Sequence, residues 1–435
     1  MKEVNIIGAG LAGCEAAYQL HKRGVKINLY EMRPKKLDEA HKTAYFGELV
    51  CSNSLRGDQL TNAVGVLKRE LLLLDSIVIK TAYEHQVPAG SALAVDRDGF
   101  AQALTAKIKA LPHVNFINEE VKNIDLTKPT IIATGPLTSA ALTKQIQQLT
   151  KEDNLYFFDA VAPIIEKDSI DFSKAYYKSR YDKDEASYIN CALSQAEFDI
   201  WYEALIKAEC TKLKDFEKLI LFEGCMPIEE MARRGKKTLL FGPLKPVGLW
   251  KDENHRAVAI VQLRQDDAKA SLYNLVGFQT HLTWPEQKRL IQMIPGLENA
   301  TIVRYGVMHR NTYINAPKLL NPTFQSKING NLFFAGQVSG VEGYVESIAS
   351  GLMAGLNMFC YLNNQEFLTF PAETICGSMA HYITQANPQS FQPMNANFGI
   401  VSSLTNHVKK SGRKEAYAQR ALAAMESYIN EHDLA

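Results

Sequence analysis

The sequence predicts an α/β fold in which a doubly wound, mostly parallel sheet carries an inserted α+β domain. Two observations support this prediction. Short apolar runs alternate with helix-forming stretches over the first third of the chain and again over residues 331–351. The intervening segment, from about residue 150, is instead rich in aromatic and charged residues. Alternation of strands and helices is typical of a parallel sheet covered by helices.

Length and composition describe a globular protein with more than one domain. The 435 residues predict two or three domains. The hydrophobic content of 46% and the charged content of 22% are ordinary values that allow a large core. No apolar run is expected to reach the roughly 18 to 20 residues of a membrane span. The chain enters a strand directly, which argues against a signal peptide. We therefore expect no membrane contact.

The cysteines and the charge restrict the location and the partners. The seven cysteines are scattered without a CxxC pair, which suits a reducing cytoplasm and predicts no metal site. The net charge of +1 neither indicates nor excludes nucleic acid. Any RNA contact must therefore come from a local basic patch.

The N-terminus carries a dinucleotide-binding fingerprint. An apolar run over residues 4–7 leads into a glycine turn, a helical stretch, and a second strand that ends at Glu31. We expect Gly8 to permit the tight turn, Gly10 to let the backbone approach a pyrophosphate, and Gly13 to let helix and strand pack closely. The helix N-terminus then faces the phosphates. Glu31 follows about 20 residues later, where a carboxylate accepts hydrogen bonds from ribose hydroxyls.

Residues 32–60 form a long polar, turn-rich stretch that breaks this pattern. Long irregular segments beside a cofactor-binding fold are either functional or disordered. Cys51 lies within this segment. From the local sequence it is either a small buried thiol or a catalytic one.

The next segments predict further elements of the same sheet. Residues 62–84 are expected to form a helix and then a buried strand. Asp96-Arg97-Asp98 indicates either a turn near a ligand, followed by an N-capped helix through Ile108, or a surface turn with a solvated ion pair. Residues 114–118 and 130–135 are predicted strands, and the second ends in Ala-Thr-Gly. This strand-ATG element, following a GxGxxG turn, favours FAD over NAD as the bound cofactor.

The inserted segment contains a second candidate thiol. Cys225 precedes Pro227, where a helix is predicted to start, and a helix N-terminus favours the thiolate form. The alternative is a structural cysteine. The cationic run Arg233, Arg234, Lys236 and Lys237 either meets phosphates or, as is more usual, forms a solvated face.

The fold is predicted to close late in the chain. Residues 331–337 form a buried strand, and the following helix contains small residues that allow tight docking toward the flavin, as in FAD-binding oxidoreductases of the glutathione-reductase type. The tail carries a basic patch at His407, Lys409, Lys410, Arg413 and Lys414 and ends in an amphipathic helix from about Lys414 to Ile429. The predicted domains are 1–149 and 301–362 (FAD-binding), 150–300 (inserted) and 363–435 (helical tail).

Seven segments, in order, resemble one family. They are GAGLAG from Gly8, GELVCSNS from Gly47, VPAG with ALAVDR from Val87, FEGCMPIE from Phe222, FGPLKPVGL from Phe241, VMHRNT from Val307, and GVEGYVES from Gly340. Together they resemble TrmFO, the folate- and FAD-dependent tRNA uracil-5-methyltransferases. The match spans residues 1 to about 360 without a departure at these landmarks.

The resemblance implies a flavin- and folate-dependent methyl transfer. The family forms 5-methyluridine in the T-loop of tRNA, taking the one-carbon unit from 5,10-methylenetetrahydrofolate through FAD, with NADH or NADPH as reductant. Carbon 5 of uracil is a poor nucleophile until a thiolate adds to carbon 6, so the reaction needs a reactive cysteine. A 23S rRNA uridine is an alternative substrate, and no obligate protein partner is expected.

The resemblance also assigns roles to residues. Cys225 is the first choice for attack on carbon 6 and Cys51 its partner near the flavin, although the reverse assignment stays open. His309 would stack on the pterin of the folate, unless it is an ordinary hydrogen-bonded histidine. Arg97 and Lys245 are further candidate substrate or folate contacts. The expected FAD-binding residues are Gly8, Ala9, Gly10, Leu11, Ala12, Gly13, Glu31, Thr134, Gly135, Gly336, Gln337, Gly343 and Tyr344.

Three other functions compete with this one. The related enzyme that modifies wobble uridines is longer and has additional C-terminal helices. A plain NAD(P)H-flavin oxidoreductase more often has a second GxGxxG, which this sequence lacks. An RNA-binding flavoprotein without catalysis would not need both motif cysteines.

Overall fold

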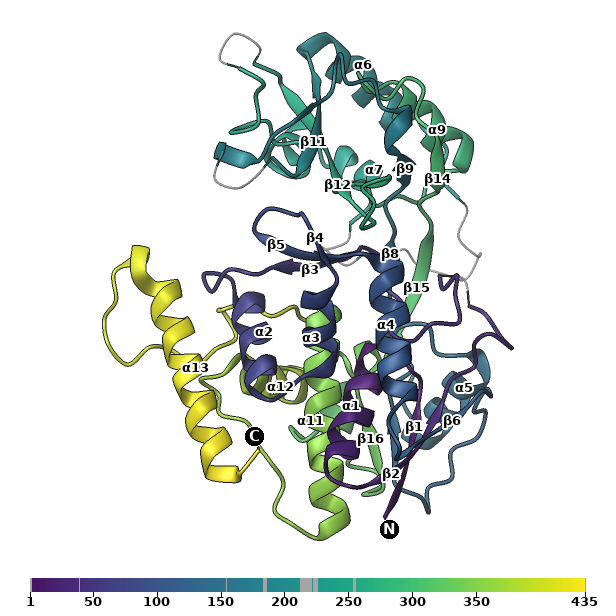
Figure 1. Ribbon diagram of the computed structural model, residues 1–435, viewed down its shortest axis with the longest axis vertical. Coiled ribbons are helices and arrows are strands. Elements are labelled where there is room, and N and C mark those ends of the chain that lie inside the picture. Colours follow the sequence, from purple (N-terminus) through teal and green to yellow (C-terminus); the bar gives the residue numbers. More distant parts are fainter. Residues whose placement is uncertain are drawn as a thin grey trace.

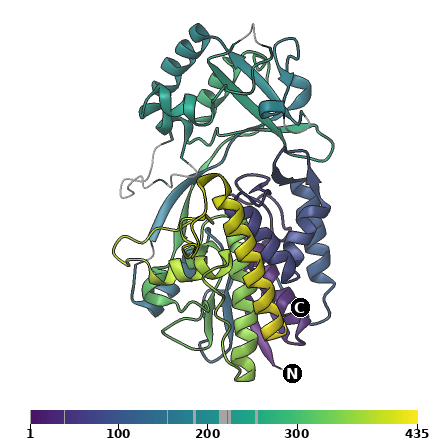
Figure 2. The same cartoon turned by 90° about the vertical axis from the view of Figure 1, so that its left-hand side faces the viewer.

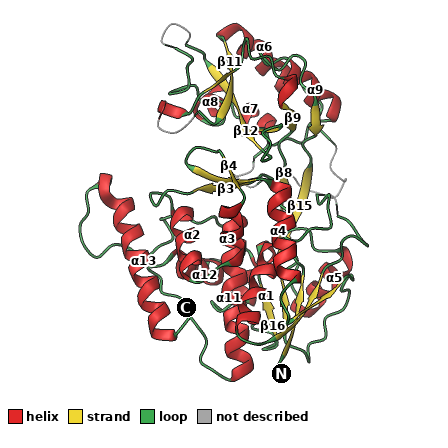
Figure 3. Cartoon of the chain, viewed as in Figure 1, coloured by secondary structure: helices red, strands yellow, loops and turns green. Residues whose placement is uncertain are grey.

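The computed structural model describes most of the chain and comprises two sheet-based parts (Figures 1 and 3). The described residues are 2–38, 40–153, 155–182, 186–211, 221, 226–252 and 256–434. In Figure 1 the part that contains both termini lies below, and the part built from the middle of the chain lies above.

The lower part is organised around a five-stranded parallel sheet in the order β16-β7-β1-β2-β6. Apolar side chains bury these strands, as expected for a sheet covered on both faces. The strands predicted at residues 4–7, 26–31, 114–118, 130–135 and 331–337 are all confirmed. They are β1 (Glu3–Ile7), β2 (Lys26–Tyr30), β6 (Val114–Ile117), β7 (Thr130–Ile132) and β16 (Leu332–Phe334).

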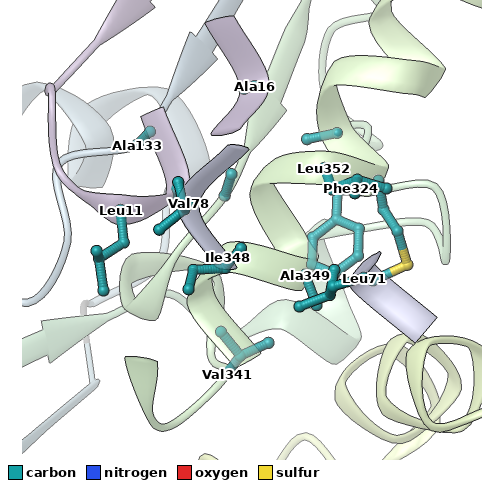
Figure 4. Close-up of a cluster of buried hydrophobic side chains, with 14 of the residues drawn as sticks. Leu11, Ala16, Leu71, Val78, Ala133, Phe324, Val341, Ile348, Ala349 and Leu352 are labelled. Carbon is teal, nitrogen blue, oxygen red and sulfur yellow. The ribbon is translucent and has the colours of Figure 1, made fainter. Parts of the chain in front are cut away.

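Two helices with small residues pack closely beside this sheet. α1 (Leu11–Lys22) lies against α11 (Tyr344–Asn363). A side chain at Gly351 would overlap the backbone of Ala12, so the contact requires glycine. Figure 4 shows Leu11 and Ala16 of α1 near Ile348, Ala349 and Leu352 of α11. α4 (Arg97–Lys109) and α5 (Ala140–Thr150) complete the layers beside the sheet.

The prediction of a strand after the helix at residue 62 is wrong. Two helices, α2 (Ala63–Leu73) and α3 (Ile77–Glu84), occupy this region. The β-branched residues at 77–79 favour a strand locally, but Ser76 caps the helix by accepting a hydrogen bond from the backbone N–H of Ile79. Ser76 also donates to the buried carboxylate of Glu15 at 2.6 Å. Capping and burial against α1 and α4 outweigh the local propensity.

Two small antiparallel sheets lie between the two parts. One has the order β3-β5-β4, and the other pairs β8 with β15 in register from Leu155–Tyr313 to Ala160–Met308. The β8–β15 pair carries the chain into the upper part and back again (Figure 1). These strands are β3 (Ser54–Gly57), β4 (Gln86–Val87), β5 (Ala92–Val95), β8 (Leu155–Ala160) and β15 (Met308–Tyr313).

The upper part has its own sheet and its own hydrophobic core. The sheet has the order β10-β11-β12-β13-β9-β14 and is antiparallel. Its strands are β9 (Ile164–Glu166), β10 (Tyr176–Tyr177), β11 (Tyr188–Leu193), β12 (Ala259–Gln265), β13 (Leu272–Leu275) and β14 (Ile302–Arg304). Its helices are α6 (Gln195–Ile206), α7 (Ile228–Arg233), α8 (Lys236–Phe241) and α9 (Trp284–Gln292). The core includes Trp201, Phe198 and Tyr273. The exact domain boundaries stay a prediction.

The C-terminal segment returns to the lower part. α12 (Ile375–Gln385) and α13 (Arg413–His432) both pack against α2, and their buried residues join the core of the lower part. α13 confirms the predicted amphipathic helix and extends it by one residue at its start and by three at its end. The remaining short elements are α10 (Ala316–Leu319), η1 (Lys167–Ser169), η2 (Arg180–Asp182), η4 (Gln337–Ser339) and η5 (Lys410–Gly412).

Among the described residues, one helix is long and apolar enough to cross a membrane by length and composition alone. This helix is α11, whose most apolar stretch of 18 residues has a mean hydropathy of 1.2 and is 78% buried inside the structure. The expectation that no apolar run is long enough is therefore wrong for α11, which is a core helix of the lower part.

A buried carboxylate links the C-terminal segment to α2 and predicts a pH dependence of stability. Glu70 is fully buried and accepts hydrogen bonds from the backbone N–H groups of Ile375 (2.7 Å) and Cys376 (2.9 Å). Burial outweighs these bonds and raises the pKa of Glu70 to about 7. The folded state then binds the proton more tightly than the unfolded state, so this contribution to stability is lost as the pH rises from about 4.5 to about 7.

The free energy of unfolding of the wild type should fall between pH 5 and pH 8. We expect this fall to be smaller by about 1–3 kcal/mol in Glu70→Gln, which has no proton to lose. Denaturant titrations at several pH values measure this. Glu366→Gln, at an exposed carboxylate in the segment that precedes Ile375, is the control and should keep the wild-type pH dependence. An unchanged slope in Glu70→Gln would contradict the account.

Candidate functional site

The glycine turn after β1 forms one wall of a cavity with about 970 Å³ of empty space. The three glycines have the separate roles that the sequence predicts. Gly8 has a φ of +105°, and a side chain there would overlap the carbonyl of Ala133. A side chain at Gly13 would overlap the carbonyl of Gly8, whereas one at Gly10 would meet nothing within 4 Å. Gly10 therefore leaves open the space that a pyrophosphate needs.

The N-terminus of α1 opens into the same cavity. Gly10, Leu11 and Ala12 line it, no side chain caps the helix, and its first turn has no acidic residue. The first N–H groups and the positive end of the helix dipole thus stay available to an anion. Ala9, between the glycines, instead donates its N–H to Glu31 at 3.1 Å.

Glu31 is held in its ionised form beside the cavity. Its carboxylate accepts hydrogen bonds from the backbone N–H and the guanidinium of Arg33, each at 3.1–3.2 Å. Burial alone would raise the pKa of Glu31, but the bonds to Arg33 outweigh it and lower that pKa. Arg33 was not predicted as a site residue. It also lines the cavity, and its guanidinium lies 3.2 Å from the carboxylate of Glu48. It lies in the irregular stretch after β2, where periodicity gives no indication.

The opposite wall comes from the carboxyl ends of β7 and β16. Thr134, Gly135, Gly336 and Gln337 line the cavity, and the N–H of Gly336 donates to Ser350 at 2.7 Å. Ligands of doubly wound sheets bind at this edge, outside the carboxyl ends of the parallel strands. The geometry therefore suits an extended dinucleotide between α1 and the two strand ends.

A second cavity of about 970 Å³ adjoins the first. The two share lining residues, namely Val50, Pro136, Gln337 and Tyr344. Among the other residues of the second cavity are Cys51, Gly343, His309, Asn311, Arg264 and Arg56. Ligands in the two cavities would thus lie on either side of a wall formed by these four residues.

Tyr344 fixes the loop that carries Cys51. Its hydroxyl oxygen accepts hydrogen bonds from the backbone N–H groups of Cys51 (2.8 Å) and Ser52 (3.1 Å). Burial raises the pKa of Tyr344, so the phenol stays neutral at physiological pH. The Cys51 sulfur lies 3.8 Å from the carbonyl oxygen of Ala160 and remains half-buried on the cavity wall.

The far side of the second cavity gathers carboxyl groups. Asp159, Glu342 and Glu346 line it, and Arg56 pairs with Glu346 at 3.2 Å. Burial and the negative charges of Asp159 and Glu346 raise the pKa of Glu342 well above its ordinary value. The sequence analysis gave these acids no role, because only the fold brings β8 next to the start of α11.

His309 and Asn311 enter the second cavity from β15. Both are almost fully buried, and alternate residues of the strand face the same side. The structure thus brings His309 and Cys51 into one cavity, from loops and strands that are more than 250 residues apart in the sequence.

Arg97 and Lys245 line neither cavity. The guanidinium of Arg97 is buried, forms an ion pair with Asp266 at 2.9 Å, and donates to the carbonyl of Leu49. The interpretation of a solvated surface pair is therefore wrong, and Arg97 supports the Cys51 loop from behind. Asp96 precedes α4 as predicted, but its side chain forms no capping bond. Lys245 follows α8, and its carbonyl accepts a hydrogen bond from Arg180 at 3.1 Å.

Cys225 lies outside the described residues. The described chain continues at Met226, and α7 begins at Ile228, one residue after the predicted Pro227. The N–H of Ile228 donates to the carbonyl of Gln279 at 2.8 Å, and Gln279 lines the second cavity. Of the cationic run that follows, Arg233 pairs with Glu230 and Lys236 with Asp199, which favours a solvated face.

One group of side chains in the upper part has the composition of a metal site. The ligand atoms of Cys210, Glu229 and His281 lie within 4.8 Å of one another. Although burial opposes it, hydrogen bonds with Cys210 and Glu229 raise the pKa of His281 to about 10. The guanidinium of Arg233 also lies 3.6 Å from the Cys210 sulfur. The side chains of His281 and Arg233 thus already supply positive charge to this group.

The fold and the first cavity define the class of FAD-binding, doubly wound proteins. Residues 3–366 match the family model described as Glucose inhibited division protein A. The chain is 61% identical to the methylenetetrahydrofolate–tRNA-(uracil-5-)-methyltransferase TrmFO of Anoxybacillus flavithermus, over 98% of this chain and 99% of that protein. It is also 61% identical to the protein of the same name from Listeria monocytogenes, over 99% of both. The chain therefore belongs to this family and, within it, to the TrmFO group, which confirms the resemblance.

Two solved structures share the fold. They are two crystal forms of Aquifex aeolicus GidA, with TM-scores of 0.71 and 0.70 at 16% and 17% identity. They cover 99% and 98% of this chain, whereas this chain covers 75% and 76% of theirs. At this identity the likeness concerns the fold alone.

The contrast between Gly10 and Gly13 gives a prediction. Gly10→Ala adds a methyl group that meets no protein atom but enters the space beside the helix N-terminus. We expect the thermal midpoint of the apoprotein to stay unchanged while FAD affinity falls about tenfold or more. Flavin fluorescence titration measures the affinity.

Gly13→Ala is the matched comparison, because its methyl group would overlap the backbone of Gly8. It should lower both the thermal midpoint and FAD binding. Wild-type FAD affinity in Gly10→Ala would contradict the assignment of this cavity.

Proposed function

We propose that the chain methylates carbon 5 of a uridine in the T-loop of tRNA. The one-carbon unit comes from 5,10-methylenetetrahydrofolate by way of FAD, and NADH or NADPH is the reductant. The observation that carries this proposal is the pair of adjoining cavities, which share Tyr344 and Gln337, with Cys51 on the wall of the second cavity next to the shared Val50. The name of the relatives at 61% identity over the full length supports the same reaction.

The residues of the first cavity suit FAD. The open space at Gly10 and the free N–H groups of α1 would hold the pyrophosphate, and the ionised Glu31 would accept from the ribose. Thr134, Gly135, Gly336 and Gln337 would hold the part of the cofactor nearer the second cavity. When bound, FAD supplies the transfer of the one-carbon unit and of the reducing electrons, chemistry that no side chain provides.

The second cavity would hold the folate and the target base. His309 would stack on the pterin, and Glu342, whose pKa is raised by burial and by the charges of Asp159 and Glu346, lies on the wall of the same cavity. The buried phenol of Tyr344 keeps Cys51 in place during the reaction. Because Tyr344, Gln337 and Pro136 border both cavities, the reacting ligands would meet without a long transfer.

A cysteine thiolate would activate the base. Its sulfur forms a bond to carbon 6 of the uracil, which makes carbon 5 nucleophilic, and the bond breaks again when the proton leaves carbon 5. We assign this attack to Cys225 and a supporting role to Cys51, with the reverse assignment as the alternative. The segment that follows Cys225 supports the assignment, because Ile228 is hydrogen-bonded to Gln279 of the cavity wall.

The proposed location is the cytoplasm. Nucleophilic attack by a cysteine thiolate needs a reduced thiol, and the six cysteines among the described residues are all unpaired.

A side-by-side transfer assay tests the proposed function. FAD-loaded protein receives labelled methylenetetrahydrofolate and NADH with either an unmodified tRNA transcript or a 23S rRNA transcript. We expect the label in the T-loop uridine of tRNA. Label only in rRNA would keep the chemistry and change the substrate. NADH oxidation without labelling of either RNA would leave a flavin oxidoreductase and contradict the proposal.

Single cysteine variants provide a further prediction. Cys225→Ala and Cys51→Ala should each lower methyl transfer by at least about a hundredfold while FAD content stays at the wild-type level, since neither thiol is expected to hold the cofactor. Incorporation of label and flavin absorbance are measured on the same samples. Cys210→Ala, a partly buried thiol outside both cavities, is the control and should stay active. Full activity in Cys225→Ala would move the nucleophile elsewhere.

A further inference from the structure

A cluster of cations lies where the chain enters α13. Lys409, Lys410, Arg413 and Lys414 are all exposed, and we refer to them as the basic patch. None of the four has an ion pair with a residue that the structure describes. The packing of α13 on the core uses other residues, chiefly Ala418, Ala421 and Met425. The patch is therefore available to a partner and is not needed for the core.

The patch is continuous with the second cavity through Arg56. Lys414 and Arg56 line the same surface hollow, beside the start of α2. Arg56 also lines the second cavity, together with Cys51. Its guanidinium pairs with Glu346, and the Arg56 side chain remains 39% exposed. A row of positive charge thus leads from α13 to the mouth of the cavity where the base would react (Figure 2 faces this side, with α13 in front).

The hollow between these cations also presents an aromatic surface. Phe398 lines it and stacks on Tyr417 of α13, with ring centroids 5.5 Å apart and an angle of 20° between the rings. Exposed cations that alternate with aromatic rings are typical of surfaces that hold a nucleic acid backbone and its unstacked bases. The first turn of α13 has no side-chain cap and contains one acid, the exposed Glu415, among the cations Arg413 and Lys414.

We propose that the basic patch and Arg56 form the docking surface for the phosphate backbone of the RNA, which directs the target loop into the second cavity. The proposal rests on the function proposed above and adds the place where the partner binds. The net charge of the chain is only +1, so a polyanion needs such a local surface. A membrane surface suits this region less, because the row of charge ends in a cavity and not on an apolar face.

Charge reversal of the patch tests the proposal. The variant Lys409→Glu/Lys410→Glu/Lys414→Glu changes only exposed side chains, so we expect FAD content, NADH oxidation and the thermal midpoint to stay at wild-type values. Affinity for a tRNA transcript should fall at least about tenfold near 0.1 M salt. The slope of log affinity against log salt should decrease in magnitude by about two to three, since about one unit is lost per phosphate contact.

A matched control carries the same change of charge elsewhere. Lys128→Glu/Lys144→Glu/Lys151→Glu alters three exposed lysines on and near α5, which lies on the opposite side of the lower part from α13 (Figure 1). It should keep tRNA affinity within about twofold of wild type. Equal losses in the two variants would reveal only an effect of net charge and overturn the proposal, as would unchanged affinity in the patch variant.

The binding readout separates this proposal from the proposed function. Wild-type protein that binds tRNA but does not methylate it would contradict the proposed function. The docking proposal would then stand if only the patch variant lost tRNA affinity, and fall if both variants or neither did. Absence of tRNA binding by the wild type would overturn both. Loss of binding to anionic lipid vesicles in the patch variant, with RNA affinity unchanged, would assign the patch to a membrane surface and overturn the RNA proposal.

Discussion

The close contact between α1 and α11 is the constraint on which the site depends. Gly351 accepts the backbone of Ala12 where any larger residue would overlap it. The helices therefore lie side by side although more than 300 residues separate them in the sequence, and both begin at the same edge of the parallel sheet. The start of α1 forms the wall of the first cavity, and Tyr344 at the start of α11 borders both cavities.

Buried polar contacts connect the upper part to this arrangement. Asn53, two residues after Cys51, donates to the carbonyls of Val95 and Gln265, both at 2.9 Å. Arg264 of β12 donates to Asn53 and Ser52 in return. A buried donor or acceptor that loses its partner costs about 1–3 kcal/mol, so these bonds strongly favour one position of the loop. The strand β12 thus supports the Cys51 loop from one side, and Tyr344 holds it from the other.

The sequence predicts the parts of the site that depend on local pattern. The glycine turn and Glu31 follow from spacing, and each parallel strand follows from a short apolar run. The predicted strand at residues 77–79 is wrong, because three β-branched residues favour a strand locally while the Ser76 cap and burial against α1 produce a helix. Local sequence assigns no role to the charged residues whose partners are brought near only by the tertiary fold. These residues are Arg33, Arg56, Asp159 and Glu342. Arg97 is a candidate substrate or folate contact from the sequence, whereas in the fold its guanidinium is buried in an ion pair with Asp266 and lines neither cavity.

Electrostatics also separate the two cavities. The first combines a helix N-terminus with an ionised Glu31, which suits phosphates and ribose hydroxyls. The second combines the neutral phenol of Tyr344 and a buried carboxyl group of raised pKa, Glu342, with a histidine and a thiol. Two ligands of different chemistry can therefore occupy neighbouring space without competing for the same groups.

A crystal structure of the FAD-loaded protein with a bound tetrahydrofolate tests the central claim most directly. The account predicts the flavin at the shared wall of Tyr344 and Gln337, and the pterin in the second cavity between the flavin and His309, with Cys51 beside it. Folate density outside the second cavity, or a flavin that does not reach the shared wall, would contradict the account.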